Sequence, residues 1–492
     1  MDSKPNSNFY FVSALGALVL SSAGIYWGSG LHPIWWLTWL APIPVLIAAP
    51  RLPFWGAWGI AFFAWAIGDL NVWHYDRAIV DVPLAICILA LLGPAIVFAW
   101  AVVLFRRCVL RRALWQAVLI VPALWVAFEY LSEIWSPHST WGNLGYSQMN
   151  FPPILQIASI TGIWGISFCV LLFNATIAAL ASSADRNSKR RLALGAGMFL
   201  ALVFCFGAWR LHFTPGSPTI KVGLIASDVP ANLDPKNGAA LPVFEQYAAH
   251  IDSLASQGGE AAVIPEKTAV MDAKSLVALD RILSDTAAHD RVFILAGVLR
   301  YPGPYNESRL YSPDGRVVAT YDKHHLMPQL ESDEIPGALR IIVDQPSGKW
   351  GLQICKDMDF PQLSRQYGND GAGLLLVPAW DFVADGWLHG RMAILRGIES
   401  GFSIARSVKQ GILTVSDDRG RVVAQRNTAS APFVTLIATV PVRHDSTFYD
   451  RFGNWFAWLD LFLLATLFVA SAGSAGKIGS MISRRGFAAL KA

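Results

Sequence analysis

Long runs of apolar residues dominate this 492-residue chain, and they are unevenly distributed along it. Residues 1–215 consist mostly of such runs, and one more run begins near residue 455. Hydrophobic residues make up 54% of the sequence and charged residues only 15%, whereas a typical soluble domain carries about 25% charged residues. The chain is therefore predicted to combine a membrane part with one soluble domain, at residues 217–445.

Eight apolar segments approach the length of about 20 residues that an α-helix needs to cross a bilayer. They are roughly residues 9–28, 33–50, 54–73, 82–105, 115–131, 154–181, 192–213 and 455–473. The first is not read as a signal peptide, because it lacks a strongly basic start and an A-x-A-like cleavage site, and seven further segments follow. The second is short and interrupted by proline.

The loops between these segments differ in charge, and the difference predicts their orientation. Basic residues follow the fourth, sixth and eighth segments, whereas the loop after the fifth, 132–153, has no Lys or Arg. Because positively charged loops stay in the cytoplasm, eight spans with both termini inside satisfy every loop. The expected parts are a membrane domain of seven helices at 1–215, an extracytoplasmic domain at 217–445, a last transmembrane helix at 455–473 and a basic cytoplasmic tail at 474–492. The net charge of +4 lies at segment ends and does not predict nucleic-acid binding.

The soluble domain alternates predicted strands and helices. Strands are expected at 219–227, 261–264, 292–297, 310–312, 317–321, 350–355, 373–378, 403–406 and 411–417, with a return strand after Asp418-Arg-Gly420. Helical patterns occupy 241–257, 273–289 and 388–401. Asp314-Gly315, between two of the strands, is a strong hairpin signal. This mixture predicts an α/β sandwich.

Three reactive side chains follow predicted strands of this domain: Glu266, Lys323 and Cys355. The other four cysteines lie in or beside apolar segments, so Cys355 has no disulfide partner in its own domain. Because sites in α/β sheets form beyond the carboxyl ends of strands, the three side chains can converge. A thiolate can attack an acyl carbon, a carboxylate can take the thiol proton, and an ammonium can stabilise the oxyanion. Taken singly, each has an ordinary alternative, as a buried structural cysteine or a solvated charge.

These residues resemble the motifs of the nitrilase, or carbon–nitrogen hydrolase, superfamily, whose Glu–Lys–Cys triad lies in an α-β-β-α sandwich. Pro265-Glu266, Tyr321-Asp-Lys323 and Ile354-Cys355-Lys-Asp follow the order of its three motifs. With this domain between the seventh and eighth spans, nearly the whole chain is similar to the apolipoprotein N-acyltransferases of bacteria. Further similar stretches are Gly-Tyr-Ser-Gln at 145–148, Gln-Ile-Ala-Ser-Ile-Thr-Gly-Ile-Trp-Gly-Ile-Ser-Phe at 156–168 and Lys-x-His-Leu-Met-Pro-x-x-Glu at 323–331.

The resemblance implies a ping-pong reaction without a cofactor. Cys355 would attack an ester of a membrane phospholipid, with Glu266 as general base and Lys323, together with the backbone N–H of Lys356, at the oxyanion. The acyl chain would then pass to the amine of a diacylglyceryl cysteine at a lipoprotein N-terminus. Glu331 matches a second essential glutamate of the family. We expect a monomer in the bacterial inner membrane, with its catalytic domain on the periplasmic side.

Some positions depart from the family pattern, and they lie where the acyl acceptor is expected. After the nucleophile, Lys356 and Asp357 stand in place of an aromatic residue and a glutamate. Lys356 would either lower the pKa of the neighbouring thiol or point into solvent, and Asp357 would keep the carboxylate at shorter reach. No metal site is predicted, because the spacing of His324, His325 and His389 is not that of a ligand set.

Four side chains are expected to contact substrate: Trp380, Phe382, Tyr146 and His325. Trp380 and Phe382 would face lipid from a lid. The loop of Tyr146 would line a lipid entrance or form a plain interfacial turn, and His325 would organise the loop beside Lys323.

Other classes of function stay open. One is a membrane-tethered nitrilase-type amidase that transfers the acyl group to water, and another is an acyltransferase with a different amine acceptor. A third is a non-catalytic membrane protein, such as a transporter with a sensing domain. That class would need ionisable residues along a pathway inside the spans, where few are present.

Overall fold

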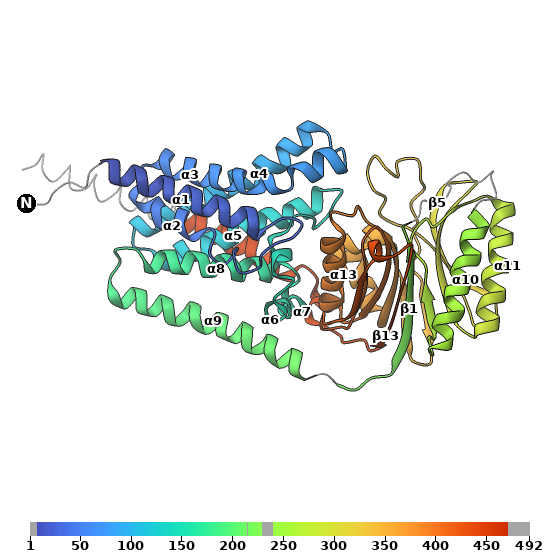
Figure 1. Ribbon diagram of the computed structural model, residues 1–492. Coiled ribbons are helices and arrows are strands. Elements are labelled where there is room, and N and C mark those ends of the chain that lie inside the picture. The colour runs from blue at the N-terminus through green and yellow to red at the C-terminus, as the bar shows by residue number, and fades with distance from the viewer. Residues whose placement is uncertain (1–6, 214, 229–239, 471–492) are drawn as a thin grey trace, which may run out of the picture. The chain divides into compact units, whose positions relative to one another are not determined.

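The computed structural model describes residues 7–213, 215–228 and 240–470, and the chain divides into two compact units (Figure 1). The first unit comprises residues 1–134, 164–202 and 454–492, and the second comprises residues 135–163 and 203–453. The basic tail predicted at 474–492 lies outside the described residues.

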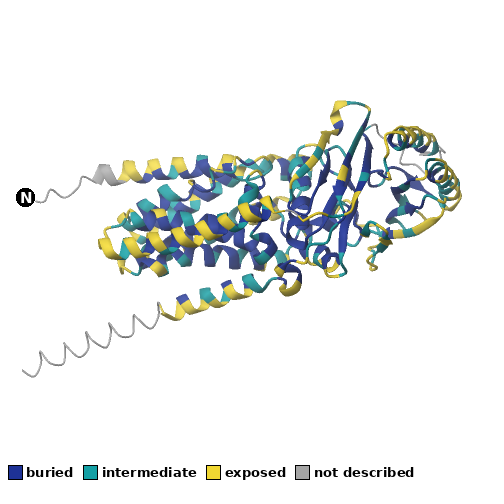
Figure 2. Ribbon diagram, turned by 90° about the horizontal axis from the view of Figure 1, so that it is seen from below, coloured by how far each residue is buried: buried dark blue, intermediate teal, exposed yellow. Residues whose placement is uncertain are grey.

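The first unit is built of helices. They are α1 (Ser7–Gly28), α2 (Ile43–Ala48), α3 (Phe54–Gly68), α4 (Leu84–Leu110), α5 (Leu114–Trp135), α8 (Trp164–Leu180), the first part of α9 (Arg186–His212) and a helix at Trp455–Ala470. Large apolar side chains are exposed on them: Trp55, Leu89 and Val469 are each more than 70% exposed. Figure 2 shows exposed residues along these helices. Apolar surface of this kind marks contact with a membrane or a partner rather than with water.

Fewer helices are long and apolar enough to cross a membrane than the eight predicted. Among the described residues four qualify, namely Phe11–Gly28 and the helices α4, α5 and α9, while Trp164–Leu180 and Trp455–Ala470 are shorter. The second predicted span, 33–50, consists of turns followed by the six-residue α2. Prolines at positions 33, 42, 44 and 50 explain this, because each lacks the N–H that a continuous helix requires.

The sixth predicted span, 154–181, is broken at Gly162. It begins in α6 (Pro152–Leu155) and α7 (Ala158–Thr161), which belong to the second unit, and continues in α8. Gly162 has a φ of +67°, and a Cβ there would lie 2.6 Å from the ring of Tyr449. Only glycine meets both demands, so a count of apolar residues could not reveal this break.

The second unit contains the predicted sandwich, with two sheets between two helical layers (Figure 1). The first sheet has the strand order β13-β1-β2-β4-β5-β6, with β3 beside β4, and the second has the order β12-β11-β10-β9-β8-β7. Strands of the first sheet are β1 (Thr219–Ser227), β2 (Ala261–Val263), β3 (Val270–Met271), β4 (Phe293–Arg300), β5 (Tyr305–Tyr311), β6 (Val317–Asp322) and β13 (Phe433–Pro441). Strands of the second are β7 (Ile342–Gln345), β8 (Gly348–Leu352), β9 (Ala372–Trp380), β10 (Ser403–Lys409), β11 (Ile412–Ser416) and β12 (Val422–Asn427).

Successive residues along the strands face opposite sides of each sheet, so each sheet packs against the other sheet on one side and against helices on the other. Leu224 of β1 and Leu374 of β9 lie in one core between the sheets. Their neighbours Ile225 and Leu375 point the other way, toward the helices. Helices α10 (Ala240–Ser256) and α11 (Ala273–Asp290) cover the first sheet, and α12 (Pro361–Asn369) and α13 (Gly386–Ser400) cover the second. The α-β-β-α sandwich is therefore confirmed.

Candidate active site

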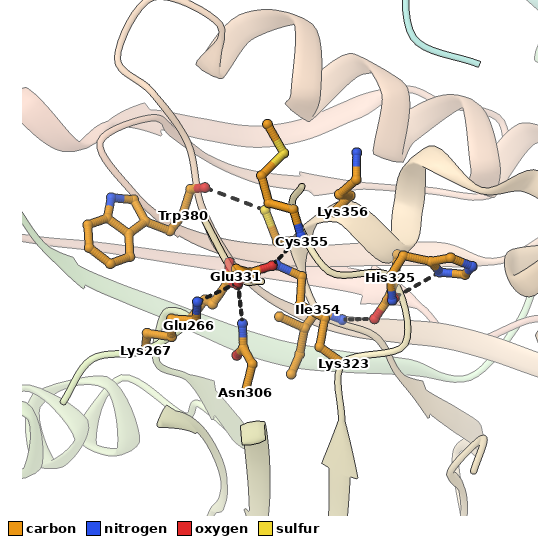
Figure 3. Close-up of polar contacts among 12 residues, drawn as sticks. Glu266, Lys267, Asn306, Lys323, His325, Glu331, Ile354, Cys355, Lys356 and Trp380 are labelled. Atoms are coloured by element: carbon orange, nitrogen blue, oxygen red, sulfur yellow. Dashed lines mark hydrogen bonds and ion pairs between the residues drawn. The ribbon is translucent and has the colours of Figure 1, made fainter. Parts of the chain in front are cut away.

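Glu266, Lys323 and Cys355 each follow the carboxyl end of a strand. Glu266 comes shortly after β2, Lys323 comes directly after β6, and Cys355 comes shortly after β8. The first two belong to one sheet of the sandwich and Cys355 to the other. Figure 3 shows the sulfur of Cys355 beside the group formed by the other two residues and Glu331.

Lys323 lies at the centre of a buried cluster. Its Nζ donates to Oε1 of Glu266 at 2.8 Å and to the two oxygens of Glu331 at 3.0 and 2.8 Å. The amide of Asn306 donates to the same two carboxylates, at 2.6 and 3.0 Å. Burial opposes the charge on Lys323, but the carboxylates outweigh it and hold its pKa well above the usual range. Lys323 is therefore a permanent cation in the site.

A second lysine, Lys267, forms an ion pair with Glu331. The Nζ of Lys267 lies 2.5 Å from Oε1 of Glu331 and 2.5 Å from Oε1 of Glu334. The backbone N–H of Met327 donates to Oε2 of Glu331 at 2.6 Å. Burial works to raise the pKa of Glu331, but Lys323 and Lys267 override it and lower this pKa to about 2. Glu331 therefore stays ionised and acts as a fixed anion that orients the lysines.

Cys355 opens the short 3₁₀ turn η6 (Cys355–Asp359) with a φ of +44°. This left-handed conformation is strained for a residue with a Cβ and is common at functional sites. Its Sγ lies 3.5 Å from the carbonyl oxygen of Trp380. Burial and the Glu266 carboxylate raise the pKa of the Cys355 thiol well above its usual range, although Lys323 acts to lower it. The expectation of a thiol with a lowered pKa is therefore wrong, and the thiol needs a base to take its proton.

Lys356 does not point into solvent, as one interpretation predicted. Its side chain is 5% exposed, and its Nζ lies 3.0 Å from Nδ1 of His138 and 3.7 Å from Oδ2 of Asp359. Burial lowers the pKa of this ammonium. Lys323, rather than Lys356, is the cation that acts most strongly on the thiol.

Asp357 organises the backbone around the nucleophile. Its buried carboxylate accepts hydrogen bonds from the Tyr321 hydroxyl at 2.7 Å and from the backbone N–H of Ile354 at 3.1 Å. It also accepts the backbone N–H of His325 at 2.8 Å and faces that residue's ring Nδ1 at 3.1 Å. The His325 ring stacks on Phe360, with centroids 3.6 Å apart. Asp357 and His325 therefore order the two loops that carry Lys323 and Cys355.

Trp380 is held inside the site rather than on a free lid. Its carbonyl oxygen accepts a hydrogen bond from the thiol of Cys355, and its indole N–H donates to Gln410 at 3.0 Å. The ammonium of Lys409 lies 3.5 Å from the centre of its ring, a cation–π contact. Phe382 is half-buried, and its backbone N–H donates to Asp385 at 2.9 Å.

Tyr146 is not brought to the cluster. Its side chain is buried, and its hydroxyl lies 2.6 Å from Oγ1 of Thr140 and accepts a hydrogen bond from Arg396 at 3.2 Å. A buried hydroxyl with these partners supports the packing of its loop and offers no surface to a substrate.

One group of side chains in the described part of the chain has the spacing of metal ligands: Asp381, Asp385 and His389, whose ligand atoms lie within 4.8 Å of one another. Arg406 donates to both carboxylate oxygens of Asp381, at 2.9 and 2.5 Å. Burial lowers the pKa of His389, but Asp385 and its neighbours overcome this and raise it to about 9. The Asp381 carboxylate is therefore already paired with a cation on both oxygens, which does not suit a metal ligand.

Sequence reasoning missed several residues of the site: Asn306, Lys267, Lys409 and His138. The position of Lys267, directly after Glu266 in the sequence, could have indicated that it belongs to the site. No sequence feature indicated Asn306, since its role depends on the pairing of β5 with β6, which sets it beside Lys323.

Two family models match the chain. Residues 252–442 match the carbon–nitrogen hydrolase family, and residues 21–176 match the apolipoprotein N-acyltransferase N-terminal domain. The second unit therefore carries a carbon–nitrogen hydrolase domain with a cysteine, a lysine and two glutamates at its site.

Named relatives resemble the chain over most of its length. An apolipoprotein N-acyltransferase of Geobacter metallireducens is 25% identical, covering 91% of this chain and 92% of its own. One of a Nostoc species is 23% identical, covering 88% and 86%. Among solved structures, a carbon–nitrogen hydrolase from Helicobacter pylori aligns with 46% of this chain and 90% of its own, at 14% identity and a TM-score of 0.40. The two family matches and the near-full-length relatives place the chain in the apolipoprotein N-acyltransferase family, as a bacterial membrane protein.

Proposed function

We propose that this protein transfers a fatty acyl chain from a membrane phospholipid, through a thioester on Cys355, to the N-terminal amine of a diacylglyceryl-cysteine lipoprotein. One observation carries the proposal: the thiol of Cys355 meets the buried Glu266–Lys323 pair in a chain that has both domains of the family. The relatives named above are apolipoprotein N-acyltransferases, which supports lipids and lipoproteins as substrates.

Glu266 is the proposed general base. Its Oε1 accepts from Lys323 and Asn306, whereas its Oε2 has no hydrogen-bond partner among the described residues. That oxygen keeps a lone pair for the proton of Cys355. Because the pKa of the thiol is raised, proton transfer and attack on the ester carbon occur together rather than from a preformed thiolate.

The tetrahedral intermediate carries its negative charge on the former carbonyl oxygen. The ammonium of Lys323 and the backbone N–H of Lys356 are the proposed donors to this oxyanion, and both are held in place before the substrate arrives. Collapse breaks the ester bond, and the lysophospholipid leaves with the proton held by Glu266. The acyl group stays on Cys355 as a thioester.

In the second half-reaction the amine of the lipoprotein attacks the thioester carbon. Glu266 takes a proton from the nitrogen, the carbon–sulfur bond breaks, and the amide product leaves. The thiolate of Cys355 recovers its proton from Glu266, so both residues return to their starting states.

The membrane setting extends this proposal. The segment 132–153 has no Lys or Arg and contacts the catalytic domain through His138, and the absence of positive charge favours the periplasmic side for both. Both substrates are anchored in the bilayer and would reach the thiol laterally. A monomer suffices for this chemistry, because one chain supplies Glu266, Lys323 and Cys355.

A direct test gives the purified protein, in detergent, a phospholipid and a diacylated lipopeptide, and follows the lipopeptide by mass spectrometry. We expect a mass gain of one acyl chain, and none with Cys355→Ser. Release of free fatty acid without acylated peptide would refute transfer and favour the amidase alternative. A Cys355→Ser variant with full activity would refute every mechanism built on the thioester.

A further inference from the structure

The segment between α5 and the 3₁₀ turn η4 (Leu144–Gln148) supplies two side chains to the turn that carries the nucleophile. Nδ1 of His138 lies 3.0 Å from Nζ of Lys356, across 218 residues of sequence. Oγ1 of Thr140 donates to the carbonyl oxygen of Asp359 at 2.9 Å. Lys356 and Asp359 are the second and last residues of η6, so the two contacts hold the turn near both of its ends.

This turn needs external support, because its first residue is strained. Cys355 adopts a φ of +44°, in the left-handed region that residues with a Cβ avoid. Such conformations persist only when the surrounding structure over-determines them. Asp357 supplies part of that support from within the domain, through the backbone N–H of Ile354. His138 and Thr140 supply the rest from a segment that precedes the domain in sequence.

The ammonium of Lys356 has its shorter polar contact with His138. It is buried, and the Asp359 carboxylate forms an ion pair with it at 3.7 Å, beyond normal hydrogen-bond length. The ring of Phe360 is further off, at 5.8 Å. Burial and the charge of Lys356 lower the pKa of His138 to about 4, so the imidazole is neutral at physiological pH and its Nδ1 can accept the proton of the ammonium. Without this acceptor the buried ammonium would keep only the longer contact with Asp359, and the turn would lose one of its two contacts with the 136–143 segment.

We propose that His138 is a positioning residue for the reaction: through Lys356 it holds the backbone N–H next to Cys355, and the strained thiol itself, in reactive geometry. This inference rests on the proposed function, since it concerns formation of the thioester. It assigns a part in the chemistry to a segment outside the carbon–nitrogen hydrolase match at 252–442.

The test measures single-turnover formation of the acyl-enzyme from a phospholipid with a labelled acyl chain. His138→Ala should slow this step by about 10- to 100-fold, since small misplacements of reacting groups have effects of that size. The concentration of phospholipid that gives half-maximal rate should stay within about two-fold, because His138 acts on the turn and not on the lipid. His138→Gln should recover most of the rate, since its amide oxygen can accept from Lys356.

A double-mutant cycle separates positioning from general destabilisation. In a Lys356→Met background there is no ammonium to hold, so adding His138→Ala should cause little further loss. His250, which stacks on Phe433, offers a matched control, and His250→Ala should react like the parent protein. Should His138→Ala fail to fold, His138→Asn is measured in both backgrounds, because its shorter side chain leaves Lys356 unbound in the same way.

The outcomes distinguish this inference from the function on which it rests. If the unmodified protein forms no acyl-enzyme, the proposed function fails. If it forms one and His138→Ala reacts at the parent rate, the inference is overturned. The inference is also overturned if the loss from His138→Ala is as large with Met at position 356 as with Lys.

Discussion

Replacing Glu266 by Gln should raise the alkylation rate of Cys355 and abolish acyl transfer. The carboxylate of Glu266 raises the pKa of the thiol, so a neutral amide lowers it and leaves Lys323 to favour the thiolate. The same change removes the proposed acceptor of the thiol proton. Cys355 should therefore become easier to alkylate while acyl transfer is lost.

Both effects can be sized from general magnitudes. At an effective dielectric constant of about 20, a unit charge about 5 Å away changes the energy of the thiolate by about 3 kcal/mol, or about two pKa units. Intrinsic reactivity of a thiolate falls by about half a logarithm for each unit of pKa that is lost. The net result is an alkylation rate about 10-fold higher at pH 7. Loss of a general base slows thioester formation by about 10²- to 10⁴-fold.

The assay follows reaction with iodoacetamide from pH 6 to 9, with the modified cysteine located by peptide mass spectrometry. The parent protein, treated in parallel, gives the reference rate for Cys355. Glu334→Gln is the matched control, since Glu334 pairs with Lys267 and is not among the main influences on the thiol. Slower alkylation of Glu266→Gln at pH 7, or acyl transfer near the parent rate, would refute this account of the site.

Other predictions concern the charges around the thiol. Glu331→Gln places an amide N–H₂ against Lys323 whichever way it is oriented, and we expect about 10²-fold slower thioester formation, corresponding to about 3 kcal/mol, in the single-turnover assay. The pKa of Glu331 is lowered from its ordinary 4.5 to about 2, so its contribution to stability is complete above about pH 4.5 and is lost as the pH falls toward 2. Thermal unfolding in detergent should show this acid loss in the parent protein and a smaller loss in Glu331→Gln. Arg406→Met leaves the Asp381 carboxylate buried without its partner, which should cost about 3–5 kcal/mol and lower the melting temperature measured by intrinsic fluorescence; an unchanged melting temperature would contradict that reading.

Local sequence patterns predicted most of the sandwich, and missed elements whose patterns are weak. The strand predicted at 219–227 is β1 itself, and the helix predicted at 273–289 is α11, which begins at a capping box formed by Asp272 and Ser275. The unpredicted elements include β3, β7, α12 and β13. β13 pairs antiparallel with β1 from more than 200 residues away in the chain. Pairing between such distant segments leaves little trace in either segment alone.

The same distinction holds for the site. Glu266, Lys323 and Cys355 could be found because each reactive side chain follows a predicted strand, and a strand end is a local feature. The environment of Lys356 could not be found, because sequence shows that it adjoins the thiol but not that His138 and Asp359 enclose its ammonium. For this reason the predicted direction of the thiol pKa was wrong. Residues adjacent in sequence affect the pKa of the thiol less than burial and the Glu266 carboxylate from the opposite sheet.

A raised thiol pKa suits a nucleophile on the proposed periplasmic side of the membrane. Oxidation of cysteine proceeds through the thiolate, so a permanently ionised Cys355 would be vulnerable in an oxidising compartment. Burial and the carboxylates of Glu266 and Asp381 disfavour a further anion at rest, against the opposing charges of Lys323 and Arg406. In the proposed mechanism the thiol becomes nucleophilic only as Glu266 takes its proton during attack on an acyl donor. A thiol that stays protonated at rest is less open to oxidation, and the same cluster would supply its base and its oxyanion donor.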